Sequence, residues 1–460
     1  MKVLLISHPD KIHQKADFPP VGIAYLGGAA RSIGFEPMLI DGGMTPVPEI
    51  LERIRNHQPD LIGVTCWTIN RETVWDLCAR LKDVAPAAFL VLGGSHSSLF
   101  PAHVFAKTHA SAVVIGEGEE TFKELLLTLQ NKGDLSKVNG LALKKADGTV
   151  YLTEKRQRIA DLDTVPMPYY KGFKDFDFNE YLGFPVLPRP VAPIISSRGC
   201  VFDCSYCSSV SFWGNSWRGR SAENILDEIE WLLKEMGARS IYFFDDNFPV
   251  RKERVIEVCD GIKKRNLNFL WACCSHVKLV NRELLQKMRD CGCISIDFGV
   301  ESGSNKILKN INKKQTREDI EAAFSAAHAV GISPRAYLMV GNKGETAETI
   351  DETIDLIGKI KPRSSIGAQI LLLLPGTQEY RSAVQNNFVT DDYWLKTDTV
   401  PYNLQEYNLK DLTKFRIRLM RGVARKKGSL VAMIGFYLKV LFYRYPKLAL
   451  LRSYVPDLFK

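Results

Sequence analysis

Three cysteines lie close together near the middle of the chain. Cys200, Cys204 and Cys207 follow a C-x3-C-x2-C spacing within residues 196–209. Three thiolates can bind a four-iron four-sulfur cluster at three of its irons and leave the fourth iron open to a small chelating ligand. Zinc loops usually contain C-x2-C pairs, and no second pair follows at a suitable distance. The spacing therefore predicts a cluster with an open iron; the alternatives are a zinc knuckle with a distant fourth ligand, or three incidental thiols.

The cysteine loop resembles the signature of the radical S-adenosylmethionine (SAM) superfamily. That signature has an aromatic residue directly before the third cysteine, which is Tyr206 here. In the family, the open iron binds the amino and carboxylate groups of SAM, and an electron from the cluster cleaves SAM to methionine and a 5′-deoxyadenosyl radical. The resemblance implies a radical enzyme that receives electrons from an external donor such as a flavodoxin or ferredoxin.

The elements that would position this loop are repeated strands and helices. After residue 190, six apolar runs (APIISS, SIYFFDD, FLWACC, ISIDFGVES, RAYLMVG and AQILLLLPG) alternate with amphipathic segments such as residues 222–236 and 316–330. Such repeats predict a parallel sheet covered by helices. Six units predict a partial (β/α)6 barrel of TIM type, with the active site at the carboxyl ends of the strands.

Residues at these strand ends are candidates for binding SAM. With the resemblance as guide, they are Tyr206, Asp245, Asp246, Glu301, Gly341 and Pro375. The resemblance implies that the two aspartates accept hydrogen bonds from the SAM ammonium, that Glu301 binds the ribose, and that Pro375 lies near the adenine. The alternative for each is a strand end followed by a helix cap, because Asp is a preferred capping residue.

Other chemically active side chains also follow or lie in the barrel strands. His276 follows the third strand at the active end, so it is a catalytic candidate. Cys273, Cys274, Cys291 and Cys293 lie in or beside the third and fourth strands. Adjacent strand residues point to opposite faces, so only one of Cys273 and Cys274 can face the barrel interior. We interpret these thiols as core residues; contact with substrate or an auxiliary cluster is the alternative.

The sequence before the barrel predicts a second α/β domain. Residues 1–140 alternate short apolar runs with amphipathic segments, which predicts a doubly wound parallel sheet. Ligands of such sheets bind outside the carboxyl ends of the strands, where this sequence is rich in glycine and small residues. Residues 141–190 are rich in proline and aromatics and read as a linker, followed by the barrel over 191–380 and a helical, basic region over 381–460.

This domain order is similar to the cobalamin-binding subgroup of the superfamily, which includes class B methylases and anaerobic cyclases. The similarity to this subgroup includes three stretches of the N-terminal sequence, PPVGIAYLGGAAR, GGSHSS and GEGEETF. Many cobalamin domains ligate cobalt through the His of a D-x-H-x-x-G loop, but the matching loop here, which begins at Asp41, has no His. The resemblance implies cobalamin without a protein nitrogen on its lower face; the alternative is an empty scaffold. The implied contact residues are Asp41, Trp67, Thr68, Gly93, Gly94, Ser95, Gly116 and Glu117.

Two cofactors would divide the chemistry between them. The leading hypothesis is methylation of an unactivated carbon of a hydrophobic small molecule. A second hypothesis is a radical cyclase, dehydratase or rearrangement enzyme for a tetrapyrrole, lipid or secondary metabolite, with or without bound cobalamin. A third is a non-catalytic iron–sulfur electron carrier, which would not cleave SAM.

Composition indicates how many domains the chain can form and in which cellular compartment it acts. The 460 residues, 45% of them hydrophobic and 25% charged, suffice for two cores. Ten cysteines in a chain of this size indicate a reducing compartment. The apolar start MKVLLIS runs at once into polar sequence, which predicts a first strand and no signal peptide. We expect a cytoplasmic protein.

The last fifty residues contain twelve Lys or Arg and two Asp, a net charge of +10, so residues 1–410 contribute −1 to the overall +9. The apolar run 430–445 is interrupted by Lys439 and is shorter than the roughly 20 residues of a membrane-spanning helix. Basic and aromatic residues together predict an interfacial helix on anionic lipid; the alternative is a helical cap on the barrel. The aromatics form one apolar run and not separated stacking platforms, so we expect no nucleic-acid partner.

Overall fold

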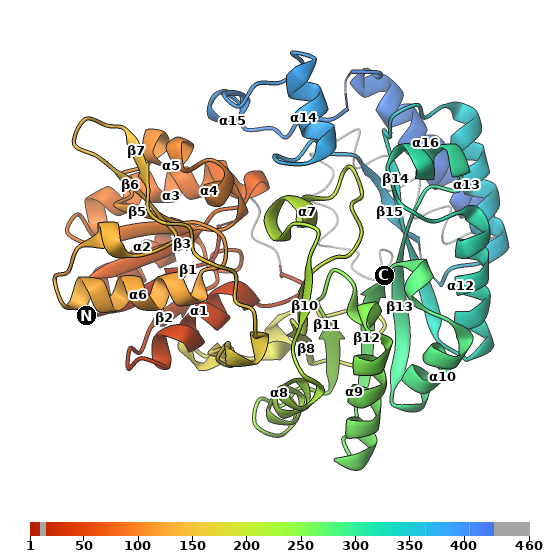
Figure 1. The fold of residues 1–460 in the computed structure, drawn as a ribbon, viewed down its shortest axis with the longest axis horizontal. Coiled ribbons are helices and arrows are strands. Elements are labelled where there is room, and N and C mark those ends of the chain that lie inside the picture. Colours follow the sequence, from red (N-terminus) through yellow and green to blue (C-terminus); the bar gives the residue numbers. More distant parts are fainter. Residues whose placement is uncertain (10–14, 364, 404, 427–460) are drawn as a thin grey trace.

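The structure, a computed structural model, contains an N-terminal α/β domain, a half-barrel, and helices that follow the half-barrel (Figure 1). It describes residues 1–9, 15–363, 365–403 and 405–426. The predicted interfacial helix lies outside the described residues. Within the described ranges, no helix combines the length and the apolar character needed to cross a membrane.

The N-terminal domain is built on a seven-stranded sheet in the order β2-β1-β3-β4-β5-β6-β7. Its strands are β1 (Val3–Ile6), β2 (Met38–Ile40), β3 (Leu61–Thr65), β4 (Phe89–Gly93), β5 (Ala112–Val114), β6 (Leu141–Lys144) and β7 (Val150–Leu152). β1 to β5 pair in parallel, as their continuous apolar sequences predict. β6 and β7 come from the start of the segment expected to be a linker, and they pair antiparallel at the sheet edge.

Helices cover both faces of this sheet, which confirms a doubly wound fold. They are α1 (Val21–Arg31), α2 (Val47–His57), α3 (Arg71–Val84), α4 (Ser95–Leu99), α5 (Pro101–Lys107) and α6 (Glu119–Gln130). Apolar residues of α1 and α6 pack with one set of alternate strand residues, and those of α2, α3 and α5 pack with the other set. Strand side chains alternate between faces, so each face has its own core.

The predicted barrel is present as a six-stranded parallel sheet in the order β15-β14-β13-β12-β11-β8. Its strands are β8 (Val191–Ile194), β11 (Ser240–Phe243), β12 (Leu270–Ser275), β13 (Cys293–Glu301), β14 (Ser333–Val340) and β15 (Ser365–Ile370). Its helices are α8 (Ala222–Lys234), α9 (Lys252–Lys264), α10 (Arg282–Asp290), α11 (Asn305–Asn310), α12 (Arg317–Ala329) and α13 (Ala347–Ile360). A hairpin of β9 (Ser197–Gly199) and β10 (Trp217–Gly219) encloses the cysteine loop and α7 (Ser208–Trp213).

The two domains share apolar and polar contacts. One hydrophobic core contains residues of both α1 and α8. The Tyr25 hydroxyl of α1 also donates to the fully buried carboxylate of Glu228 in α8, at 3.3 Å. Gly28 has a packing role in α1, because a Cβ there would lie 2.1 Å from the Met167 carbonyl oxygen of the connecting segment. These contacts fix the two sheets relative to each other.

The chain beyond the barrel returns to the N-terminal domain. α14 (Gln378–Gln385) and α15 (Tyr393–Lys396) lie beside that domain, and α16 (Leu409–Lys426) packs on α13 (Figure 1). The buried guanidinium of Arg71 donates to the carbonyls of Thr68 at 2.8 Å, Trp394 at 3.2 Å and Thr399 at 3.0 Å, and also to that of Thr397. One side chain thus ties the returning segment to the end of β3.

Replacement of Arg71 by Lys should loosen this connection. An ammonium group lacks the planar fork of a guanidinium and cannot satisfy the four carbonyls. We expect Arg71→Lys to lower the free energy of unfolding by about 1–3 kcal/mol, measured by urea denaturation. The exposed Arg80 of the same helix supplies the control Arg80→Lys, which should leave the midpoint unchanged. Equal effects of the two variants would contradict this role.

Candidate functional site

The cysteine loop lies between the two domains, where Figure 1 shows α7 at the centre of the molecule. Cys200 and Cys204 are buried, and Cys207 is half-buried. Burial raises the pKa of all three thiols, that of Cys207 to about 11. A thiolate is therefore costly there unless a cation neutralises it, as the irons of a cluster would.

Hydrogen-bond donors point at one of these sulfurs. The backbone N–H of Phe202 donates to Cys200 Sγ at 3.4 Å, and Asn247 Nδ2 donates to the same sulfur at 3.1 Å. Among the described residues, no three His, Cys, Asp or Glu side chains converge as a single ion would require. A cubane places each thiolate on a different iron, so such convergence is not needed. The donor set and the hydrogen bonds to sulfur fit a cluster.

The two aspartates after β11 have different roles. Asp245 is buried and accepts four hydrogen bonds, from the backbone N–H groups of Ser196 and Ser197 at 2.7 and 3.1 Å and from both serine hydroxyls. It therefore anchors the start of the cysteine hairpin and has little capacity left for a ligand. Asp246 is exposed and accepts from the Ser209 hydroxyl at 2.7 Å, so it is the aspartate that can receive an ammonium group.

Glu301 ends β13 in a strained backbone conformation beside the cysteine loop. Its φ is 62°, a left-handed value that is uncommon outside glycine and often marks functional sites. Glu301 Oε1 accepts from the Tyr206 hydroxyl at 2.9 Å and from Lys313 Nζ at 3.1 Å. Gly299 leaves room for this pair, because a Cβ there would lie 2.7 Å from Lys313 Nζ and 2.8 Å from Glu301 Oε1. Tyr206 and Glu301, both predicted from sequence, thus meet in one site with Lys313, which no motif marked.

His276 does not have the geometry of a proton-transfer residue. Its Nδ1 accepts from the backbone N–H of Lys278 at 3.2 Å, which leaves Nε2–H to donate to the Lys313 carbonyl at 2.8 Å. Its backbone N–H donates to Asn247 Oδ1, and its ring stacks on Phe202 with centroids 3.8 Å apart. Backbone groups hold both ring nitrogens, and the catalytic role of His276 stays a prediction. His276 supports the two residues that donate to Cys200.

A pH effect follows from the burial of His276. Burial, with the charge of Lys313, lowers the pKa of His276 from 6.5 to about 4. The unfolded chain takes up a proton near pH 6.5 while the folded chain does not, so acidification favours unfolding. Between about pH 7.5 and about pH 6 the wild type should lose about 1 kcal/mol more stability than His276→Asn, measured by urea denaturation at both pH values. Identical losses would contradict a buried neutral imidazole.

Gly341 and Pro375 lie in loops that are already packed. The Gly341 N–H donates to the Glu345 carboxylate and its carbonyl accepts from Asn403 Nδ2 at 3.1 Å, so its peptide groups are engaged. Pro375 is buried, and its neighbour Gly376 contacts Ser211 of α7. Three residues after Gly376, in α14, Glu379 accepts from the Ser205 hydroxyl at 2.6 Å. The loop of Pro375 therefore braces the cysteine loop.

Glycines keep the carboxyl edge of the N-terminal sheet open. A Cβ on Gly116 would meet no atom within 4 Å, and one on Gly93 would meet only Val114 at 3.8 Å. Packing therefore does not require glycine at position 93. Gly94 differs, because its φ is 98° and a Cβ would lie 2.7 Å from the Cys66 carbonyl oxygen. Ser95 begins α4 and is half-buried. This open edge fits a bulky ligand such as the nucleotide tail of cobalamin.

Trp67 and Thr68 follow β3 at the same edge. Trp67 is 47% exposed and lies beside the ring of His8, at 4.8 Å between centroids. Thr68 is buried, and its hydroxyl is 3.3 Å from His96 Nδ1. An exposed indole beside an open glycine edge fits contact with a large planar ligand. These residues support the fit to a corrin.

Asp41 and Glu117 are occupied by protein partners. Asp41 accepts from Tyr181 Oη at 3.0 Å and from the Gly43 N–H at 3.0 Å, so it holds its own loop. Glu117 forms ion pairs with Arg198 at 2.8 Å and Arg218 at 2.9 Å. Both residues were predicted to contact cobalamin. In the structure both carboxylates have protein partners, and their contact with cobalamin stays a prediction.

The remaining barrel cysteines belong to the core, as expected. Cys273, Cys291 and Cys293 are buried, and Cys291 Sγ lies 2.8 Å from Cys259 Sγ. Cys274 is half-buried and contacts the Tyr242 hydroxyl at 3.1 Å. None of these thiols belongs to a group of three potential metal ligands within the described chain. Their place in the apolar core therefore supports a packing role for Cys273, Cys291 and Cys293.

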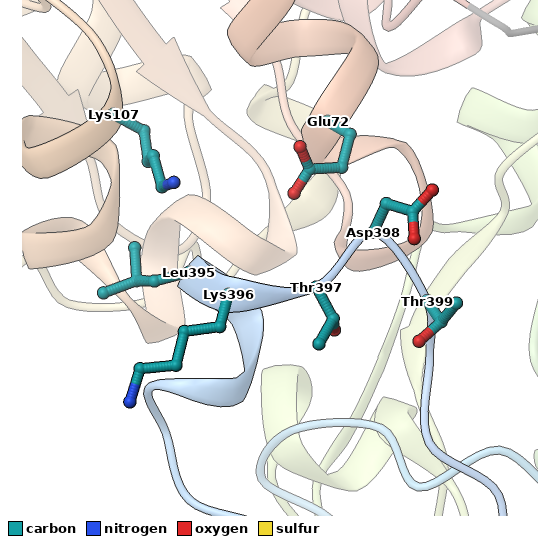
Figure 2. A pocket seen from close by; sticks show the side chains of 7 residues that line it. All are labelled: Glu72, Lys107, Leu395, Lys396, Thr397, Asp398 and Thr399. Carbon is teal, nitrogen blue, oxygen red and sulfur yellow. The ribbon is translucent and has the colours of Figure 1, made fainter.

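A cavity of about 620 Å³ lies away from these residues, between α3, α5 and the returning segment (Figure 2). Glu72 and Lys107 extend into it from α3 and α5, and residues 395–399 form the opposite wall. Charged and polar side chains dominate the lining, so it does not suit an apolar ligand. None of the predicted site residues lines it.

Comparison with known proteins identifies a family for each of the two domains. Residues 194–357 match the radical SAM superfamily, and residues 10–126 match the B12 binding domain. An uncharacterized methyltransferase of Pyrococcus horikoshii is 30% identical over 447 residues, which cover 95% of this chain and 93% of the relative. An anaerobic magnesium-protoporphyrin IX monomethyl ester cyclase of Rubrivivax gelatinosus is 30% identical over 366 residues, covering 77% of this chain and 65% of that relative.

A solved structure has the same fold. It is the radical SAM methyltransferase TsrM of Kitasatospora setae with cobalamin and a [4Fe-4S] cluster bound, and it superposes with a TM-score of 0.68. The alignment covers 83% of this chain and 76% of the other at 18% sequence identity. At this identity the likeness concerns the arrangement of the two domains.

Proposed function

The chain belongs to the radical SAM superfamily, in the group that also carries a B12-binding domain, and from this membership we propose that it methylates an unactivated carbon of a hydrophobic small molecule. The carrying observation is that the hairpin holding the three cysteines is joined to the N-terminal domain, because Arg198 of β9 pairs with Glu117 and Glu119 after β5. Methylation is supported by the relative from Pyrococcus horikoshii, which is named a methyltransferase.

The residues of this chain would act by binding and orientation. When bound, the cluster supplies an electron that cleaves SAM to a radical, and cobalamin supplies the methyl group. Cys200, Cys204 and Cys207 would hold the cluster, and the exposed Asp246 would accept a hydrogen bond from the amino group of SAM. Glu301 accepts the ribose hydroxyls, with Tyr206 and Lys313 fixing its carboxylate. Trp67, with Gly93 and Gly116, binds the corrin and its tail.

Anaerobic reconstitution tests this proposal. The purified chain is loaded with iron and sulfide, mixed with hydroxocobalamin, reduced with dithionite and given SAM. We expect corrin absorbance to co-elute with the protein, and both 5′-deoxyadenosine and S-adenosylhomocysteine to form. Intact SAM under strong reductant would contradict enzymatic radical chemistry and leave an electron carrier.

A second function on the same scaffold is radical cyclisation. It is favoured by the relative from Rubrivivax gelatinosus, which is named a cyclase for a magnesium porphyrin ester. In the same assay a cyclase would form 5′-deoxyadenosine without S-adenosylhomocysteine. That outcome would replace methylation by cyclisation.

We also propose that a flavodoxin or ferredoxin supplies the electron, and that the basic tail contacts anionic membrane surfaces. The concentration of positive charge after residue 410 supports the second point. Co-sedimentation with vesicles of phosphatidylglycerol and phosphatidylcholine should exceed that with phosphatidylcholine alone. Equal sedimentation would contradict the membrane contact.

A further inference from the structure

The loop between β5 and α6 contacts both proposed cofactor regions. Within this loop, Gly116 has a φ of 77°, a Cβ there would meet no atom within 4 Å, and its N–H donates to Ser98 Oγ at 2.9 Å. Glu117 and Glu119 come next and pair with the cysteine hairpin. A single turn of chain therefore separates the proposed corrin contact from the contact with the cluster loop.

Four side chains form an ion-pair cluster across the domains. It consists of Glu117 of the loop, Glu119 at the start of α6, Arg198 of β9 and Arg218 of β10, and we call it the interdomain ion-pair cluster. Arg198 Nη1 lies 2.8 Å from Glu117 Oε1 and 3.3 Å from Glu119 Oε2. Arg218 contacts both oxygens of Glu117, at 2.9 and 3.0 Å. The geometry is bidentate on both arginines.

The interdomain ion-pair cluster acts directly on the cysteine loop. Arg198 and Arg218 face each other in the hairpin, and Arg198 precedes Cys200 by only two residues. Between them, Gly199 has a φ of 88°, and a Cβ there would lie 2.1 Å from the Ser216 carbonyl oxygen. The hairpin is thus closely packed at this point. A shift of Arg198 would move Cys200 with it.

The burial of these charges indicates a role in positioning. The Arg198, Glu117 and Glu119 side chains are 7–9% exposed. Buried ion pairs are weak stabilisers, because desolvation offsets much of their attraction, and well-packed apolar residues often replace them without loss. The bidentate pairing of two guanidinium groups with two carboxylates does, however, require one relative position of the β9–β10 hairpin and the chain after β5. The interdomain ion-pair cluster accordingly fixes the relative position of the two domains more narrowly than apolar contacts alone would.

We propose that the interdomain ion-pair cluster couples the two cofactor sites, so that binding of cobalamin at the sheet edge orders the cysteine hairpin, and the reverse. This inference rests on the proposed function. Arg198, Arg218, Glu117 and Glu119 are then positioning residues. Thermodynamic linkage requires this coupling to be reciprocal. Assembly of the iron–sulfur cluster must therefore lower the Kd for cobalamin by the same factor by which cobalamin strengthens binding of the iron–sulfur cluster.

Hydrogen exchange and binding measure this coupling on the full chain. In cluster-loaded protein, hydroxocobalamin should slow amide exchange in residues 197–219. The Kd for hydroxocobalamin, from the visible spectrum, should be about five-fold or more lower in cluster-loaded than in cluster-free protein. Arg198→Lys keeps the charge but lacks the fork, so both effects should disappear while each cofactor still binds. The control Glu223→Gln breaks an exposed pair with Arg265 and should keep both effects.

The outcomes distinguish a failure of this inference from a failure of the proposed function on which it rests. If wild-type protein binds no hydroxocobalamin or assembles no cluster, the proposed function fails. If both bind but exchange and Kd are unchanged by the other cofactor, or if Arg198→Lys keeps the coupling, the inference is overturned. Should Arg198→Lys not fold, as judged by circular dichroism, Glu119→Gln replaces it, since Glu117 still contacts both arginines in that variant.

Discussion

The Cys204→Ala variant forms no 5′-deoxyadenosine above background when reduced with dithionite in the presence of SAM. Cys204 is buried in the loop that would hold the cluster, and its replacement leaves only Cys200 and Cys207 in that loop. Only two thiolates would then hold the cubane. A second iron would lack a protein ligand, and we expect the cluster not to assemble stably. Iron and sulfide content after anaerobic reconstitution, together with product formation, checks the expectation.

Cys78→Ala provides the matched control for this loss. Cys78 is also buried, but it lies in the core of the N-terminal domain on α3. Its replacement should preserve iron content and SAM cleavage while lowering stability only through the small cavity. A Cys204→Ala protein that retained a full cluster and cleaved SAM would show that the loop is not the cluster site.

Glu301→Ala should destabilise the fold as well as abolish SAM cleavage. The substitution leaves the Lys313 ammonium, which is 8% exposed, without its carboxylate partner. Burial alone would lower the pKa of Lys313, but Glu301 and the loop thiols raise it overall, so the lysine is held charged. Removal of one partner of a buried pair costs about 3–5 kcal/mol, which urea denaturation will measure.

A double variant separates stability from chemistry at this site. Glu301→Ala with Lys313→Met removes both charges, so most of the lost stability should return. SAM cleavage should remain absent, because the proposed ribose acceptor is still missing. Glu283→Ala, which removes an exposed partner of Lys252, should cost less than about 1 kcal/mol and serves as the control. Recovery of SAM cleavage in the double variant would contradict the role of Glu301.

Residue type and spacing predicted much of the fold and the cluster loop. Apolar runs separated by helix-length segments predicted both parallel sheets, because strands buried on both faces have continuous apolar sequences. The hairpin of β6 and β7 was missed, although Asp147-Gly148 between two short runs is a turn signal that could have revealed it. The C-x3-C-x2-C spacing drew attention to a loop that the structure places between the two domains.

Individual site roles were less predictable, because they depend on partners distant in sequence. Asp245 and Asp246 are adjacent, yet two serines that precede Asp245 by almost fifty residues occupy it and leave Asp246 accessible. Glu117 lies at a strand end suited to a ligand, but its arginine partners come from the hairpin of the other domain. No local pattern distinguishes such pairs from ligand contacts.

The most direct test concerns the fourth iron. Electron paramagnetic resonance is recorded on the reduced, reconstituted protein before and after addition of SAM carrying a nitrogen-15 amino group. An iron left open by three cysteines predicts changed g values on SAM addition and hyperfine coupling to the labelled nitrogen. A spectrum that SAM leaves unchanged, or a protein that binds a single zinc in place of the cubane, would contradict SAM ligation and the radical chemistry that depends on it.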